Sequence, residues 1–311
     1  MTWAGPGAPA VITAVLLAAY AVAAGFLAPS VLRRGWTARS PRLAMSLWLA
    51  LALSAVIASV LAILAVTMPA WLTWGGSGQV ASHGGAAGWI LPCAGLVLTA
   101  AIVLRVGTCL VSESVRGRRE RGEHAALVAA AGRPDYELGV VVLDHDTPTA
   151  YCLPHGQQRI VVSAGALAAL RTEQMQAVVA HERAHLRGFH HLMLATGAAL
   201  ARAFPRVPLL AQARPQLAVL AEMAADDAAA RSHDRGDLAE ALIILARAGA
   251  RSTALAAGGP AVIARVQRLL TPPARRPARR TRLAAAAGLI LPVIIASLPL
   301  LMAACDAVSR P

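Results

Sequence analysis

Charged and aromatic residues are both scarce in this chain of 311 residues. Only 14% of the residues are charged and 4% are aromatic, whereas 57% are hydrophobic and the mean hydropathy is +0.57. Soluble globular proteins carry about 25% charged residues, so this composition favours a membrane protein. It also excludes an intrinsically disordered chain, which would have low hydrophobicity.

Paired cysteines are also lacking. The four cysteines, Cys93, Cys109, Cys152 and Cys305, show no CxxC motif and no other paired spacing. Small secreted scaffolds depend on a dense disulfide framework. The sequence therefore excludes a protein of that class and predicts free structural thiols.

The sequence contains several long runs of uncharged residues. A membrane-spanning helix needs about 20 predominantly apolar residues. Four stretches meet this requirement, at about 9–32, 43–71, 89–110 and 283–305. The one charge within them is Arg105, near the end of the third stretch, where its side chain can extend toward the membrane surface. The sequence predicts a mainly α-helical membrane protein with four transmembrane helices.

Lysine is absent, and 29 arginines against 16 acidic residues give a net charge of +13. Arginines cluster between the first two spans, after the third and before the fourth, whereas 1–8 and 72–88 contain none. The positive-inside rule predicts a multi-pass protein of the cell membrane with its N-terminus outside, a cytoplasmic segment 113–282 and an extracytoplasmic tail 306–311. The basic charge is then explained by topology and contact with the lipid bilayer, without direct nucleic-acid binding.

The cytoplasmic segment is long enough for one α+β domain that ends in the basic linker 271–282. Short β-branched runs bounded by turn residues predict strands, and longer runs with helical spacing predict helices. The expected strands are 137–143, 149–153 and 158–163, and the expected helices are 172–188, 191–204, 215–231 and 236–250.

A metal-binding motif, His-Glu-x-x-His, begins at His181. His181 and His185 are four residues apart, so both rings project from one face of a helix and can bind a single Zn²⁺. Glu182 lies beside the open metal position, where it can accept a proton from the attacking water and pass it to the leaving amine. The composition gives roughly 0.007 chance matches to this pattern. We expect one zinc ion per chain.

The third protein ligand has two candidates. Gly188 and His191 complete the metzincin pattern His-Glu-x-x-His-x-x-Gly-x-x-His, and chance arithmetic favours this longer match. Glu222 and Asp226 form Glu-x-x-x-Asp on a later predicted helix, in which the glutamate would bind zinc and the aspartate would hold a ligand histidine. A long Ala/Leu-rich helix follows His191 in place of a secreted domain with a Met-turn, and this context favours Glu222. On residue type alone, the acidic residues could also form surface ion pairs.

The order of motifs resembles the BlaR/MecR family of membrane metallopeptidases. Three spans come first, followed by a strand hairpin that ends at 149–151 and by the segment 159–165. The His181 helix, Glu222 with Asp226, and a last span then follow. The order is also similar to that of the HtpX and CAAX prenyl protease group. The resemblance covers nearly the whole chain.

The resemblance implies a zincin-like fold with His181, His185 and Glu222 as metal ligands, Glu182 as the catalytic base and Asp226 holding a ligand histidine. It implies cleavage of a cytoplasmic protein, a winged-helix transcriptional repressor like BlaI or MecI. The extracellular penicillin-binding domain of the antibiotic-sensing branch is not expected here.

Two further residues and two other functions complete the sequence-based expectations. Tyr151 and His155 lie on the hairpin before the zinc helix, where a substrate peptide could add to an edge strand of the cleft.

A non-proteolytic membrane signalling protein with a structural zinc site is the alternative, and Glu182 favours the enzyme because a structural site needs no general base. A channel or transporter is disfavoured because the spans hold no ionisable residue at mid-membrane.

Overall fold

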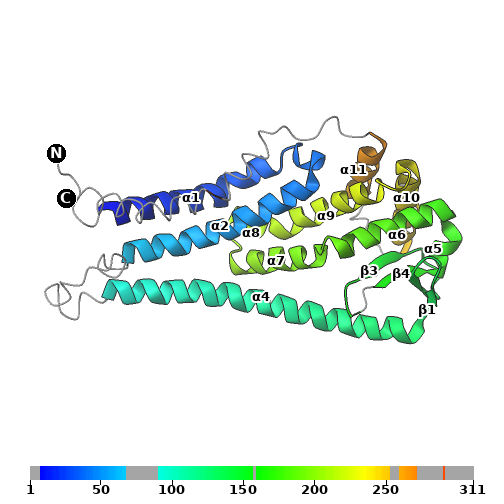
Figure 1. Ribbon diagram of the computed structural model, residues 1–311, viewed down its shortest axis with the longest axis horizontal. Coiled ribbons are helices and arrows are strands. Elements are labelled where there is room, and N and C mark those ends of the chain that lie inside the picture. Colours follow the sequence, from blue (N-terminus) through cyan, green and yellow to red (C-terminus); the bar gives the residue numbers. More distant parts are fainter. Residues whose placement is uncertain (1–7, 68–89, 157–158, 253–258, 272–289, 291–311) are drawn as a thin grey trace, which may run out of the picture.

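The computed structural model describes residues 8–67, 90–156, 159–252, 259–271 and 290 (Figure 1). Long helices run along most of the molecule, and a small four-stranded sheet lies at one end. The described chain is mainly helical, as the composition predicts.

Within the described residues, three helices are long and apolar enough to cross a membrane. They are α1 (Ala8–Leu32), α2 (Pro41–Thr67) and α4 (Ile90–Ala131), and the short 3₁₀ helix η1 (Thr37–Arg39) lies between the first two. The predicted fourth span, 283–305, lies outside the described residues apart from residue 290.

Helix α4 continues far beyond its apolar run. Its 42 residues span about 63 Å at 1.5 Å per residue, roughly twice the hydrocarbon thickness of a bilayer. Its second half is polar, and Glu113 pairs there with Arg116 at 2.6 Å and with Arg202 at 2.9 Å. One continuous helix therefore connects the apolar bundle with the sheet (Figure 1).

The sheet contains β1 (Gly132–Asp135), β2 (Val140–Leu143), β3 (Ala150–Leu153) and β4 (Arg159–Ser163) in the order β1-β2-β4-β3. β2 and β4 are parallel, and the other neighbouring pairs are antiparallel. The strand predicted from 137 begins at Val140, because Asp135 Oδ1 accepts hydrogen bonds from the amides of Glu137 and Leu138 and closes a turn. β3 lies at the edge of the sheet.

Helices follow the sheet. They are α5 (Ala164–Ala169), α6 (Thr172–Arg187), α7 (His190–Ala203), α8 (Pro208–Ala211), α9 (Ala213–Ala229), α10 (Arg235–Ser252) and α11 (Gly259–Leu270). The four predicted helices agree with α6, α7, α9 and α10 to within two residues at each end. Val178 and Val179 of α6 pack with Val140 and Val162 of the sheet, so the apolar face of α6 is buried on one side by the strands.

Helices α7 and α8 and the first part of α9 lie alongside the membrane-capable helices (Figure 1). Trp48 of α2, which is fully buried, donates a hydrogen bond from Nε1 to the carbonyl oxygen of Leu209 at 3.1 Å. Arg105 of α4, expected to extend to the membrane surface, donates from Nε to the carbonyl oxygen of Ala203 at the end of α7 at 2.6 Å. The segment predicted as a separate cytoplasmic domain thus shares its core with the bundle.

Candidate metal centre

Helix α6 presents the His-Glu-x-x-His motif toward α9. Gln174 Oε1 accepts a hydrogen bond from the amide of Arg171 at the start of α6, and the helix ends at Arg187. Gly188 follows as expected for a helix stop, and a Cβ there would lie 2.5 Å from Nε2 of His190. Phe189 then takes a left-handed backbone conformation with φ 49°, which turns the chain into α7.

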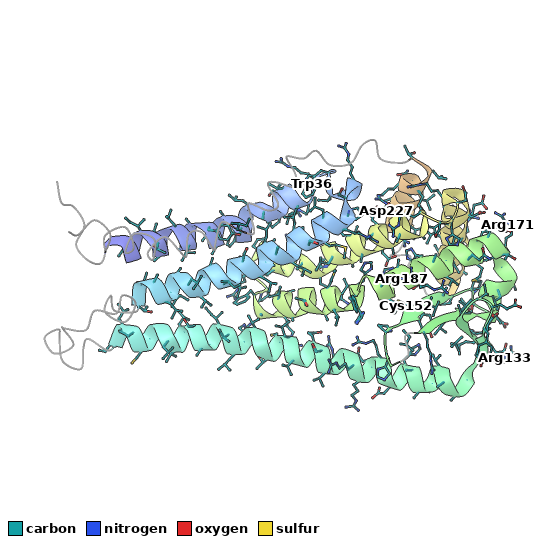
Figure 2. All side chains as sticks on the ribbon, viewed as in Figure 1. Trp36, Arg133, Cys152, Arg171, Arg187 and Asp227 are labelled. Carbon is teal, nitrogen blue, oxygen red and sulfur yellow. The ribbon has the colours of Figure 1, made fainter. Side chains whose placement is uncertain are left out.

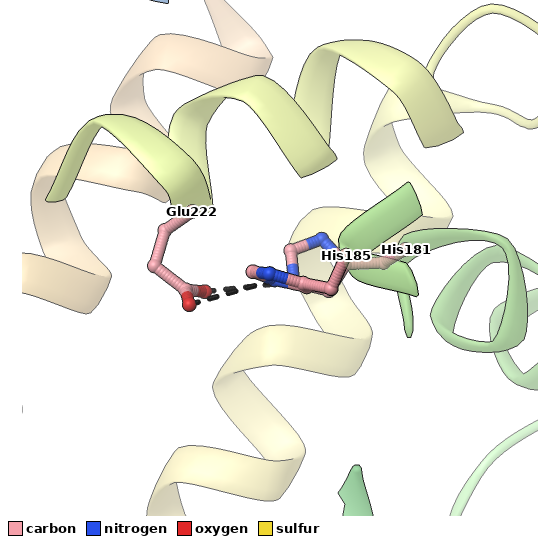
Figure 3. A group of neighbouring side chains, drawn as sticks. All are labelled: His181, His185 and Glu222. Atoms are coloured by element: carbon pink, nitrogen blue, oxygen red, sulfur yellow. Dashed lines mark hydrogen bonds and ion pairs between the residues drawn. The ribbon is translucent and has the colours of Figure 1, made fainter. Parts of the chain in front are cut away.

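The structure brings His181, His185 and Glu222 together (Figure 3). The Nε2 atoms of the two histidines are 3.1 Å apart. Glu222, from the middle of α9, places Oε2 3.5 Å from Nε2 of His181 and Oε1 3.5 Å from Nε2 of His185. One donor atom of each residue lies within 4.8 Å of the others.

These separations fit a zinc ion. Tetrahedral ligands at about 2.0–2.1 Å from Zn²⁺ lie about 3.3–3.4 Å from one another. The observed separations of 3.1 and 3.5 Å bracket that value. Two neutral imidazoles and a carboxylate leave the fourth position open, which is the ligand set of a catalytic zinc site and not of a closed structural one.

Asp226 and Arg265 contact the donor residues and hold them in place. Asp226 is 1% exposed and places Oδ1 3.0 Å from Nδ1 of His181, so Nε2 of that ring is directed at the other donors. Arg265 of α11 donates to both carboxylate oxygens of Asp226, at 2.9 and 2.7 Å, and contacts Oε2 of Glu222 at 2.8 Å. The sequence predicted the aspartate but neither α11 nor the arginine.

Negative charge dominates the electrostatics of the site. Burial disfavours a charge on His181, yet hydrogen bonds with Asp226 and Glu222 raise its pKa to about 9. Burial alone would raise the pKa of Glu222, but its contacts with His181 and Arg265 lower it to about 2. Among the described residues, Arg265 is the arginine that pairs with Glu222 and Asp226. Zn²⁺ would supply the positive charge that a proton on His181 otherwise supplies.

Glu182 lies beside the edge strand β3. Its carboxyl group forms hydrogen bonds with the backbone and side chain of Cys152, and burial raises its pKa. A raised pKa suits a group that takes up and releases a proton near neutral pH. Burial and the charge of Glu182 raise the pKa of the Cys152 thiol to about 12, so the thiol stays protonated. Cys152 is not part of any motif in the sequence, so this contact could not be predicted.

The two histidines after Gly188 have different positions. His190 is 5% exposed, and its Nδ1 lies 2.9 Å from Nδ1 of His185, so it supports this second ligand ring. His191, the metzincin candidate, lies beside Phe189 with 6.5 Å between ring centroids. In the described part of the chain, the metal-donor group contains Glu222 and not His191.

Tyr151 and His155 lie on the side of the sheet that faces α4. The Tyr151 hydroxyl is 2.7 Å from Nε2 of His124, and His155 approaches Gly122 of α4. Both belong to the hairpin that contains the edge strand, but neither contributes a donor to the metal group in the described residues.

The described residues thus contain a His-His-Glu group that could hold a metal ion, attached to a bundle of membrane-capable helices. Residues 115–218, about one third of the chain, match Peptidase family M48, so this segment is similar to the M48 metallopeptidases. The match ends before Glu222, the third donor. No curated protein and no solved structure matches the chain significantly.

Proposed function

We propose that this protein is a membrane-embedded, zinc-dependent endopeptidase that holds one zinc ion per chain. The observation that carries the proposal is the convergence of His181, His185 and Glu222 on one point, with the buried carboxyl group of Glu182 near this group and in contact with Cys152 of the edge strand β3. A structural zinc site would need neither the open position nor the adjacent buried carboxylate.

Each residue has a defined role in the proposed reaction. When bound, zinc would polarise the scissile carbonyl and the attacking water. Glu182 accepts the proton of that water and donates it to the leaving nitrogen. Asp226 and Arg265 keep His181 and Glu222 in their binding geometry, and His190 does the same for His185.

The substrate is proposed to be a cytoplasmic protein, specifically a winged-helix transcriptional repressor like BlaI or MecI. The order of spans, hairpin, zinc helix and Glu-x-x-x-Asp motif, which resembles the BlaR/MecR family, supports this assignment. An extended substrate segment would pair with β3, the edge strand beside Glu182, within reach of Tyr151 and His155. The arginine distribution supports a cell-membrane topology with the peptidase region on the cytoplasmic side.

The test combines proteolysis with metal analysis. The full chain in detergent is incubated with labelled casein as a generic substrate and with a purified winged-helix repressor, and zinc per chain is measured on the same sample. Glu182→Gln should keep zinc near one per chain and lower cleavage by about 10² to 10⁴. Cleavage by Glu182→Gln at the wild-type rate would refute the proposed base. Zinc bound without cleavage of either substrate by the wild type would favour the structural-zinc alternative.

A further inference from the structure

A cavity of about 540 Å³ lies on the side of α6 away from the sheet. Its walls come from the first turn of α2, the second half of α6, the start of α7 and the segment that follows α9. The charged and titratable residues that line it are Arg42, Arg183, Arg187, His190, Arg231 and His233. We call it the arginine cavity; Arg187 is labelled in Figure 2.

The arginine cavity lacks negative charge. None of the described residues that line it is acidic. Within the described residues, its four arginines form no ion pair with a carboxylate; Arg183 donates to the carbonyl oxygen of Leu138 at 3.2 Å, and Arg231 to that of Asp227 at 3.4 Å. The side chain of Asp227 is already paired with Arg268 at 2.7 Å. Four guanidinium groups around one cavity repel one another, and a bound anion would relieve this repulsion.

The cavity lies where a charged segment changes to an apolar one. Arg42 occupies the first turn of α2, and the uncharged run that continues to Thr67 begins at the next residue. Met45 and Ser46, one turn further along α2, also line the cavity. In a spanning helix this boundary lies at the depth of the lipid phosphates, where basic pockets between helices bind anionic headgroups.

We propose that the arginine cavity binds the phosphodiester headgroup of an anionic phospholipid. Guanidinium groups match phosphate oxygens in bidentate geometry, and a volume of about 540 Å³ is within the range of small-ligand sites. His190 forms part of the wall and contacts the metal-site ligand His185 at 2.9 Å. The bound headgroup is therefore separated from the metal centre by a single side chain.

Calorimetric titration of the full chain in neutral detergent tests the proposal. The probes are short-chain phosphatidylglycerol, phosphatidylcholine with the same acyl chains, and inorganic phosphate. Each arginine near an anionic lipid surface contributes about fivefold to affinity. Arg187→Gln/Arg231→Gln should bind phosphatidylglycerol roughly 20- to 30-fold more weakly, and Arg42→Gln alone about fivefold more weakly. The matched control Arg133→Gln/Arg247→Gln removes two exposed arginines outside the cavity and should bind like the wild type.

Three results would overturn the proposal. Equal affinity for phosphatidylglycerol and phosphatidylcholine would show that no anion site exists. Equal losses in the cavity variants and the control would assign the binding to overall charge. Displacement of the lipid by inorganic phosphate at comparable concentration would make this a site for a soluble anion. Because the titration depends on neither cleavage nor zinc, its failure would leave the proposed peptidase function untouched.

Discussion

Asp226→Asn gives a quantitative test of the support behind the metal centre. The substitution keeps the size of the side chain and removes its charge. Asp226 is 1% exposed, contacts Nδ1 of His181 at 3.0 Å and accepts two hydrogen bonds from Arg265. Removal of a partner that orients a metal-binding histidine typically weakens metal affinity 10- to 100-fold. We expect a loss of zinc affinity in that range, measured by competition with a chromophoric chelator.

The same substitution should lower stability. Breaking a buried ion pair costs about 3–5 kcal/mol because the remaining charge is left without a partner. The Arg265 side chain is 13% exposed but keeps its contact with Glu222 at 2.8 Å, so we expect a loss near the lower limit, about 3 kcal/mol. Thermal unfolding in detergent, followed by circular dichroism, measures it as a lower unfolding temperature.

Asp227→Asn is the matched control. Asp227 is the next residue of α9 and pairs with an arginine of the same helix α11, Arg268, at 2.7 Å, but its side chain is 30% exposed. We expect wild-type zinc affinity. Because the Arg268 side chain is only 9% exposed, we also expect a stability loss of about 1–3 kcal/mol, so zinc affinity is the measurement that separates the two variants. Equal zinc affinity in Asp226→Asn and Asp227→Asn would refute the role of Asp226 in orienting His181.

Three further predictions concern the ligand set, the turn after α6 and the topology. Glu222→Ala should lower zinc per chain sharply on elemental analysis, whereas His191→Ala should leave it near one; the reverse result would establish the metzincin geometry. Gly188→Ala places a methyl group against the ring of His190 and should lower the free energy of unfolding by about 1–3 kcal/mol, measured as a lower unfolding temperature. An unchanged unfolding temperature would refute this steric argument. A reporter active only in the cytoplasm should work when fused after Arg119 and not after Gly76, and the opposite pattern would place the peptidase region outside.

Local pattern was sufficient to predict most helices and the first part of the site. The period of apolar residues gave α6, α7, α9 and α10, and the four-residue spacing placed His181 and His185 on one face. The choice between Glu222 and His191 could not be made from spacing, because it depends on how α9 packs against α6. The left-handed Phe189 and the buried His190 occupy the turn that a metzincin would use to return its third ligand.

The contribution of α11 could not be predicted from local pattern. Arg265 lies 39 residues from Asp226 in sequence, and only tertiary packing brings the two side chains together. An amphipathic signal was available, since Ile263, Val266 and Leu269 recur at helical spacing before Thr271. The packing of α7 against α4 could not be predicted either. The charge of Arg202 is typical of a surface helix, and its ion pair with Glu113 is visible only in the structure.

The shared core of the bundle and α7–α9 has a consequence for biogenesis. After His185 the chain forms α7 and α8, which pack against the membrane-capable helices. Helix α9 then brings Glu222 to the two histidines. Between the two parts of the site, the carbonyl oxygen of Leu209 accepts a hydrogen bond from Trp48 of α2 at 3.1 Å, which anchors this stretch of the chain to the bundle. In the membrane peptidase proposed above, the metal centre would therefore be assembled together with the bundle, after insertion of its helices.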